Sequence, residues 1–272
     1  AGVYEVRTNN LLGDIDFASY GLSFNFAFGL KLQGQGKMST VITVKADNGE
    51  IWLYDNLASK KESFIDCHFL DMSIAKEWLN YNYKFNIVRM YSTGTNKRFR
   101  FWRCFINGDT IMSLHGTGNA DLHRFHDCQI LTDECFLDLN LNQAVAVETY
   151  STDFEVMKHF IILNDNGGGS FKQFGGNLEM HAHHSDTSDH FLFKDNGALG
   201  GKMGLGNCDF LSQGVRYEIH GANKKLFYAN RLNVDRPVIY TFDNCQMGTV
   251  SGGSRQAVYA RGFNLVVNFH NT

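Results

Sequence analysis

Three acidic side chains in the second half of the sequence are candidates for acid–base chemistry. Glu155, Glu179 and Asp209 recur at similar intervals along the chain, and each is followed by one apolar residue. Two carboxyl groups about 5 to 5.5 Å apart support retaining glycoside hydrolysis, and a pair about 6.5 to 9.5 Å apart supports the inverting reaction. Such chemistry therefore requires a fold that brings residues this far apart in sequence onto neighbouring elements.

Two histidines follow Glu179 at two-residue steps, in the stretch Leu178-Glu-Met-His181-Ala-His183. On an extended strand Glu179, His181 and His183 share one face. Such a set suits acid–base chemistry, sugar contact or a divalent metal, but its spacing matches no zinc signature. The alternative is a polar segment without a specific role. We predict substrate contacts for His181 and His183, and no metal and no other cofactor.

The stretch Asn96-Lys-Arg-Phe-Arg-Phe-Trp102-Arg103 interleaves basic and aromatic residues. Interleaving of this kind is found where proteins stack single-stranded nucleic acid. Strand alternation instead turns the two Phe side chains inward, and Trp102 outward beside the arginines. That outer face is compatible with an ordinary solvated strand or with contact to an anionic polymer. Because the net charge is −3, we predict no nucleic-acid and no membrane partner.

A repeated pattern supplies the elements that these side chains need. Five of the six cysteines lie in the form apolar, any, polar, Cys, any, apolar, and two weaker copies carry another apolar residue at the Cys position. The copies recur roughly every 24 to 37 residues, which is typical of one turn of a solenoid. The central positions are Cys67, Cys104, Cys128, Phe154, Leu178, Cys208 and Cys245.

The residue before each central position is predicted to form a corner. Side chains two apart share a face of a strand, so the apolar residue three positions before the centre can point inward only if the chain turns in between. Asp and Asn tolerate the left-handed backbone that makes such a turn. Six of the seven predicted corner residues are Asp or Asn, and the set is Asp66, Arg103, Asp127, Asp153, Asn177, Asn207 and Asn244.

The fold prediction is an all-β chain that forms one parallel β-helix domain over residues 1–272. The single proline, Pro237, permits uninterrupted sheets, and only Ser73–Asn80 favours a short helix. A hydrophobic content of 43% excludes disorder, and no apolar run approaches the roughly 20 residues of a membrane span. The cysteines are predicted to be reduced, apolar interior residues. Because the sequence begins at Ala1, it is compatible with a fragment of a longer chain.

The register of the copies predicts which outward side chains are neighbours. The residue after each central position faces outward, and successive turns lie about 4.8 Å apart. Glu155 and Glu179 are therefore predicted to be adjacent, with Gln129 one turn before and Asp209 one turn after. The alternative is that these carboxylates are only solvated and discourage sideways aggregation of strands. A lyase would need a basic residue close by, and the sequence predicts none on this face.

The Asx corner followed by an apolar pair, turn after turn, resembles the pectate-lyase-like right-handed β-helix superfamily. The stretch Leu32-Gln-Gly34-Gln-Gly36-Lys-Met-Ser39-Thr40-Val41-Ile42, preceded by Ala1-Gly2-Val3-Tyr4, is similar to the first turn of that superfamily in bacteriophage tailspike and appendage proteins. The resemblance covers most of residues 1–270. It implies a single-stranded right-handed parallel β-helix, but it does not fix an activity, because such helices carry many functions.

What the resemblance implies is a virion tail protein, usually a homotrimer, that is assembled in the host cytoplasm and recognises a host cell-surface glycan outside the cell. One alternative is a polysaccharide depolymerase, either a hydrolase or a lyase, that acts on capsule, O-antigen or teichoic acid. Another is a purely structural virion component. Catalytic candidates are Glu155, Glu179 and Asp209, and substrate-binding candidates are Trp102, Phe105, Gln129, His181 and His183.

Overall fold

A computed structural model gives the fold of the chain. It describes residues 30–44, 49–55, 65–76, 82–92, 97–116, 122–141, 145–164, 169–181, 188–196, 208–221, 223–229, 238–250, 258–260 and 265–272. Every regular element in these ranges is a β-strand, and every strand pair is parallel. The all-β prediction is confirmed. The described ranges hold no helix, and hence none long and apolar enough to cross a membrane.

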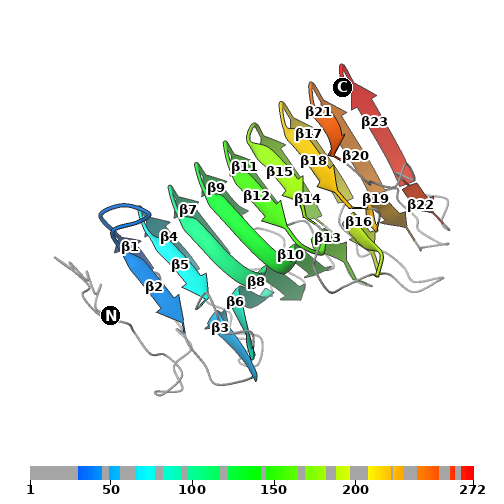
Figure 1. Ribbon diagram of the computed structural model, residues 1–272. Coiled ribbons are helices and arrows are strands. Elements are labelled where there is room, and N and C mark those ends of the chain that lie inside the picture. Colours follow the sequence, from blue (N-terminus) through cyan, green and yellow to red (C-terminus); the bar gives the residue numbers. More distant parts are fainter. Residues whose placement is uncertain are drawn as a thin grey trace.

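The first sheet contains one strand from each turn of the chain. Within the described ranges it has nine strands, which follow one another in sequence order, so that each strand pairs with the strands of the turn before and the turn after (Figure 1). The strands are β1 (Leu30–Gln33), β4 (Ile65–Leu70), β7 (Lys97–Trp102), β9 (Leu122–His126), β11 (Ala146–Tyr150), β14 (Gly169–Phe174), β17 (Cys208–Gln213), β20 (Val238–Asp243) and β23 (Leu265–His270).

The second sheet contains the remaining 14 strands and is held together by two long ones. In most turns it receives two short strands, but β8 and β10 each run through both positions: β10 pairs with β12 and β13 of the next turn. The strands are β2 (Val41–Val44), β3 (Gly49–Asp55), β5 (Ser73–Lys76), β6 (Tyr83–Ser92), β8 (Phe105–Gly116), β10 (Gln129–Leu141), β12 (Asp153–Val156), β13 (His159–Leu163), β15 (Asn177–Met180), β16 (His190–Asp195), β18 (Arg216–His220), β19 (Lys224–Ala229), β21 (Gln246–Val250) and β22 (Val258–Ala260). This stacking of turns is compatible with a solenoid.

The predicted short helix at Ser73–Asn80 is wrong for its first half. Ser73–Lys76 forms β5, which pairs with β2 on one side and β8 on the other. Ile74 lies between Ile42 and Ile106 in the register and is fully buried. Pairing on both edges thus overrides the weak local helical preference. Residues 77–80 lie outside the described ranges.

The left-handed corner is confirmed at three predicted positions. Arg103, Asp127 and Asn244 have φ of 50°, 52° and 50°. At each, the corner amide donates a hydrogen bond to the carbonyl of the last strand residue in the next turn, as from Asp127 to Tyr150 over 2.9 Å. Arg103 departs from the Asx pattern, and its guanidinium binds both carboxylate oxygens of Asp71 over 2.6 and 2.9 Å. The predicted cysteine environment is also confirmed where it is described: Cys67, Cys104, Cys128 and Cys245 are buried thiols.

The other predicted corners are wrong or lie outside the described ranges. Asp66, Asp153 and Asn177 lie within strands β4, β12 and β15, and Asn207 is not described. The bends come instead at Asp71, Ser151, Gly175 and Gly214, each with positive φ and the same amide-to-carbonyl bond to the next turn. Arg103, Asp127, Ser151 and Gly175 are evenly spaced along the sequence, which makes the central turns the most regular part of the repeat.

Gly176 provides a test of this corner geometry. Its φ is +85°, and a Cβ added there would overlap the carbonyl oxygen of Thr152 in the previous turn. We expect Gly176→Ala to lower the free energy of unfolding by about 3 kcal/mol, because the left-handed backbone and the clash both add cost. Gly175→Asn is the matched control and should change it by less than about 1 kcal/mol, since Gly175 has open space and Asn accepts its φ of +67°. Urea unfolding measures both variants, and equal losses would contradict the assigned register.

Buried histidines make the stability depend on pH. Burial and, second, the charge of Lys97 lower the pKa of His123 to about 3, and its Nδ1 accepts a hydrogen bond from the Phe99 amide over 3.2 Å. Burial and, second, Lys194 likewise lower the pKa of His159 to about 3. Since these histidines take up a proton near pH 6.5 only in the unfolded chain, stability is full above that pH and falls as the pH drops toward 3.

His123→Asn tests this dependence, because Asn keeps an acceptor atom but does not titrate. Between pH 7 and pH 5 the neutral His123 costs about 2 kcal/mol of stability. We expect the variant to lose less free energy of unfolding than the unaltered chain over that interval, measured by urea unfolding at each pH. His270→Asn, an exposed position in β23, serves as control and should leave the slope unchanged. The same slope in His123→Asn and the unaltered chain would refute the role of His123.

Candidate functional site

Three glutamates lie on consecutive turns of the second sheet, and we call them the glutamate column. Cross-strand register pairs Glu155 of β12 with Glu179 of β15, and Glu179 with Glu218 of β18. The predicted adjacency of Glu155 and Glu179 is therefore confirmed. Their side chains are 38% and 37% exposed, whereas Glu218 is only 17% exposed. The column thus offers three carboxylates one strand spacing apart, about 4.8 Å at the backbone.

Two predicted members of this column are elsewhere. Asp209 lies in β17 of the first sheet, where it is exposed and pairs with Ser170 and Ile239. Gln129 is exposed at the start of β10 and pairs with Asp153, so that Leu131 occupies the turn before Glu155. Asp209 is displaced because the corner of the turn that carries Glu218 is Gly214, well after the predicted corner at Asn207. Gln129 is displaced because the corner before Glu155 is Ser151, two residues before the predicted corner at Asp153.

Glu218 was missed because its copy of the repeat lacks both diagnostic residues. The stretch Gln213-Gly-Val-Arg216 has Gly at the corner and Val after it, in place of Asx and Cys. A different sequence pattern identifies Glu218, because the motif Glu-x-His occurs at Glu179 and again at Glu218. Matching that motif would have aligned the two turns.

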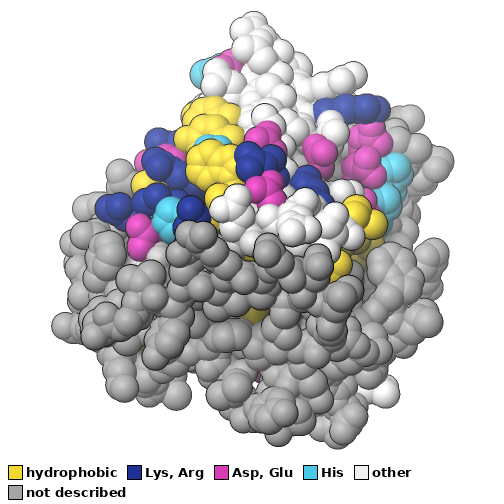
Figure 2. Space-filling view, turned by 90° about the vertical axis from the view of Figure 1, so that its left-hand side faces the viewer, with side chains coloured by type: hydrophobic (Ala, Val, Ile, Leu, Met, Phe, Trp, Pro, Cys, Tyr) yellow, Lys and Arg dark blue, Asp and Glu magenta, His cyan; other side chains and the backbone are white. Residues whose placement is uncertain are grey.

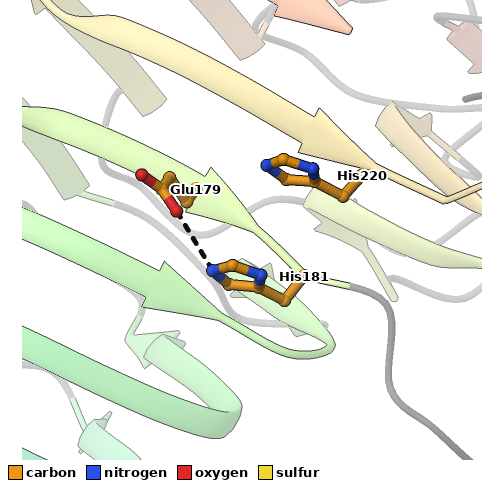
Figure 3. A group of neighbouring side chains, drawn as sticks. All are labelled: Glu179, His181 and His220. Atoms are coloured by element: carbon orange, nitrogen blue, oxygen red, sulfur yellow. Dashed lines mark ion pairs between the residues drawn. The ribbon is translucent and has the colours of Figure 1, made fainter. Parts of the chain in front are cut away.

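A histidine lies two residues after each of these two glutamates, on the same outer face. His181 directly follows β15 and His220 ends β18, and the two rings stack with centroids 5.3 Å apart and planes within 2° (Figure 3). The amide of His181 donates to the Val156 carbonyl over 2.9 Å, which extends the pairing with the previous turn and fixes the ring's position. His183, the other predicted contact residue, lies outside the described ranges.

The two imidazoles face the carboxylates. Nε2 of His181 is 3.1 Å from Oε2 of Glu179 and 3.9 Å from Oε2 of Glu155, and Nε2 of His220 is 3.7 Å from Oε2 of Glu218. Both Nε2 atoms are shielded from solvent and have no directional hydrogen bond within the described part of the chain. One ligand atom each from Glu179, His181 and His220 lies within 4.8 Å of the other two. The arrangement therefore concentrates carboxylate oxygens and imidazole nitrogens at one point.

Arg216 gives Glu218 a different environment from the other two carboxylates. Arg216 is the first residue of β18, two positions before Glu218. Its guanidinium forms a close ion pair with the Glu218 carboxylate. The expectation that no basic residue lies near the glutamates is therefore wrong. It failed because Arg216 belongs to the misaligned turn. In Figure 2 acidic side chains gather beside histidines, with Lys or Arg side chains next to them, at the right of the view.

The predicted sugar-contact residues divide between two surfaces. Phe105 of β8 is half-buried and lies beside Gln129 of β10 and, one turn further, Asp153 of β12. This row, which we call the Phe105 row, runs parallel to the glutamate column, two residues earlier in each strand. Trp102 instead ends β7 of the first sheet. Phe105 and Gln129 therefore lie on the same sheet as the glutamates, and Trp102 does not.

Trp102 belongs to an aromatic stack that the sequence reasoning did not predict. Its ring lies 3.9 Å from that of His126, which lies 4.5 Å from Tyr150, which lies 5.1 Å from Phe174. Burial and, second, Arg124 lower the pKa of His126, which favours the neutral ring in the stack. The signal was present, since all four residues directly precede a corner.

This stack changes the predicted role of Trp102. One face of the ring is covered by His126, and on its other side the register neighbour is Leu70. The ring face that stacks on His126 is therefore not open to a ligand. Figure 2 shows hydrophobic side chains with a histidine among them, flanked by basic and acidic groups.

Comparisons with protein-family models, with curated proteins and with solved structures find no match to this chain.

Proposed function

We propose that the chain is a single-stranded right-handed parallel β-helix similar to phage tailspike and appendage proteins, and that it binds a host cell-surface glycan. In this proposal it acts as a homotrimer on the virion tail. Parallel pairing throughout the described ranges and evenly spaced left-handed corners in the central turns support the fold. The observation that carries the function is the repetition of equivalent polar groups on successive turns, which suits a ligand that is itself a repeating polymer.

The glutamate column and the Phe105 row would form the binding face. Carboxylates accept hydrogen bonds from sugar hydroxyls, and charge-assisted bonds of this kind are stronger than neutral ones. Glu155 and Glu179 are partly exposed and so are open to such contacts, while Gln129 adds an amide. Phe105 supplies apolar contact at the edge of the face. A glycan lying along the stacked turns would meet one such group on each turn.

Loss of two carboxylates tests the binding face. We expect the Glu155→Ala, Glu179→Ala double variant to bind whole bacterial cells at least about 10-fold more weakly, because each charge-assisted hydrogen bond contributes about 1.5 kcal/mol or more. Labelled protein and a panel of surface polysaccharides provide the measurement. Asp209→Ala is the matched control, an exposed carboxylate on the other sheet, and should bind as the unaltered chain does. Absence of any glycan or cell binding by the unaltered chain would favour a purely structural virion component.

Polysaccharide cleavage is the second candidate function, and the adjacency of Glu155 and Glu179 favours it. One strand spacing is close to the separation of about 5 Å that retaining glycosidases use. One carboxyl group would protonate the leaving oxygen while the other attacks the anomeric carbon. Glu218 and Arg216 favour a lyase as the alternative to a hydrolase. The Arg216 guanidinium would be the cation that a lyase requires close to an acidic sugar.

Product analysis separates these activities. If the pair is catalytic, the unaltered chain releases new reducing ends from its polysaccharide, and Glu179→Gln loses at least about 100-fold in rate while its thermal unfolding is unchanged. Asp209→Asn should retain full activity. Unsaturated products in place of saturated ones would indicate a lyase. If polysaccharide is bound without new reducing ends, the chain is a binder alone.

A further inference from the structure

We propose that Glu179, His181 and His220 form a binding site for a divalent transition metal of the zinc type. Two imidazole nitrogens and one carboxylate oxygen are a donor set that holds Zn²⁺ in proteins and leaves a coordination position open. The three ligand atoms converge within 4.8 Å of one another on the outer face of β15 and β18 (Figure 3). Metal binding is independent of the glycan proposal, because it needs no polysaccharide.

The strongest indication is that two imidazole nitrogens face carboxylates without a directional hydrogen bond. Nε2 of His181 and Nε2 of His220 are both shielded from solvent, yet within the described residues neither has a directional hydrogen bond. Shielded polar atoms normally make a well-directed hydrogen bond, and the lack of one calls for an explanation such as an ion. A neutral imidazole offers a lone pair at such a nitrogen, which suits a metal ion.

The charge of the surroundings also favours a dication. Glu155, Glu179 and Glu218 together with Arg216 carry a net charge of two negative when the histidines are neutral, and a divalent ion would balance it. Oε2 of Glu155 and Oε2 of Glu218 lie 3.9 and 3.7 Å from the two Nε2 atoms, close enough to support the ligands from outside. Without a cation, three carboxylates on adjacent turns repel one another.

The side chains need only small movements to close on an ion. Zinc bonds of about 2.0 to 2.2 Å in tetrahedral geometry place ligand atoms about 3.4 Å apart. Nε2 of His181 and Oε2 of Glu179 are already 3.1 Å apart. His220 has to approach from the next turn, and it is only 27% exposed, on a strand fixed by pairing on both sides. A bound ion would therefore link two successive turns through their side chains.

Titration of the metal-free chain with Zn²⁺ by calorimetry tests this site, and Co²⁺ provides a visible absorption signal for imidazole ligation. We expect one ion per chain and a higher unfolding temperature when it is bound. His181→Gln and His220→Gln should each weaken binding at least about 100-fold, because loss of even an outer partner of a ligand costs 10- to 100-fold. Glu179→Gln should weaken it as well. His270→Gln controls for adventitious binding to an exposed histidine.

Circular dichroism shows whether each variant is folded, and the two histidine variants provide independent tests should one fail to fold. No binding by the unaltered chain would overturn the proposal, as would equal binding by the His220→Gln and His270→Gln variants. Metal binding without glycan binding would leave this site standing while the proposed function fails. Glycan binding without metal binding would overturn the metal site and leave the proposed function standing.

Discussion

The whole arrangement depends on one backbone hydrogen bond, the bond from each corner amide to the carbonyl of the last strand residue in the next turn. At Arg103, Asp127 and Asn244 a residue with positive φ donates this bond, so that hydrogen bonding to the next turn continues through the bend. Each such bond fixes where the following strand begins relative to its neighbour. Register, the inward set of apolar side chains and the outward columns all follow from it. The stacked Phe69, Phe101 and Phe125 rings, with centroids 5.0 and 4.8 Å apart, show the same alignment inside.

Sequence reasoning predicted the repeat and the class of fold because hydrophobic period and Asx corners are local signals. It failed where the chain makes the same bend with other residues: Ser151, Gly175 and Gly214 reach positive φ without Asp or Asn. An error of two positions keeps the parity of a strand, so Glu155 and Glu179 were placed correctly although their corners were not. The error of seven positions at Asn207 is larger: Asp209 lies before the corner at Gly214, in the first sheet, so it was predicted at the place that Glu218 occupies after that corner.

The candidate site shows how stacked parallel strands bring single residues together into a chemical group. Each copy of the Glu-x-His motif supplies one carboxylate and one imidazole at the end of a strand. Stacking two copies brings two carboxylates and two imidazoles together, and a third carboxylate comes from Glu155. The aromatic stack from Trp102 to Phe174 arises in the same way on the first sheet. Neither set of side chains can be identified from the sequence until the length of the repeat is known.

The central corners at Arg103, Asp127, Ser151 and Gly175 are separated by a constant length of chain, whereas Gly175 and Gly214 are separated by a longer one. The longer turn keeps its strands in register because the extra chain enters between strands rather than within them. The length of those connections can therefore change without altering the cross-strand register. Duplication of one central unit would therefore add one turn to the stack. Every row of side chains that crosses that unit would gain one member.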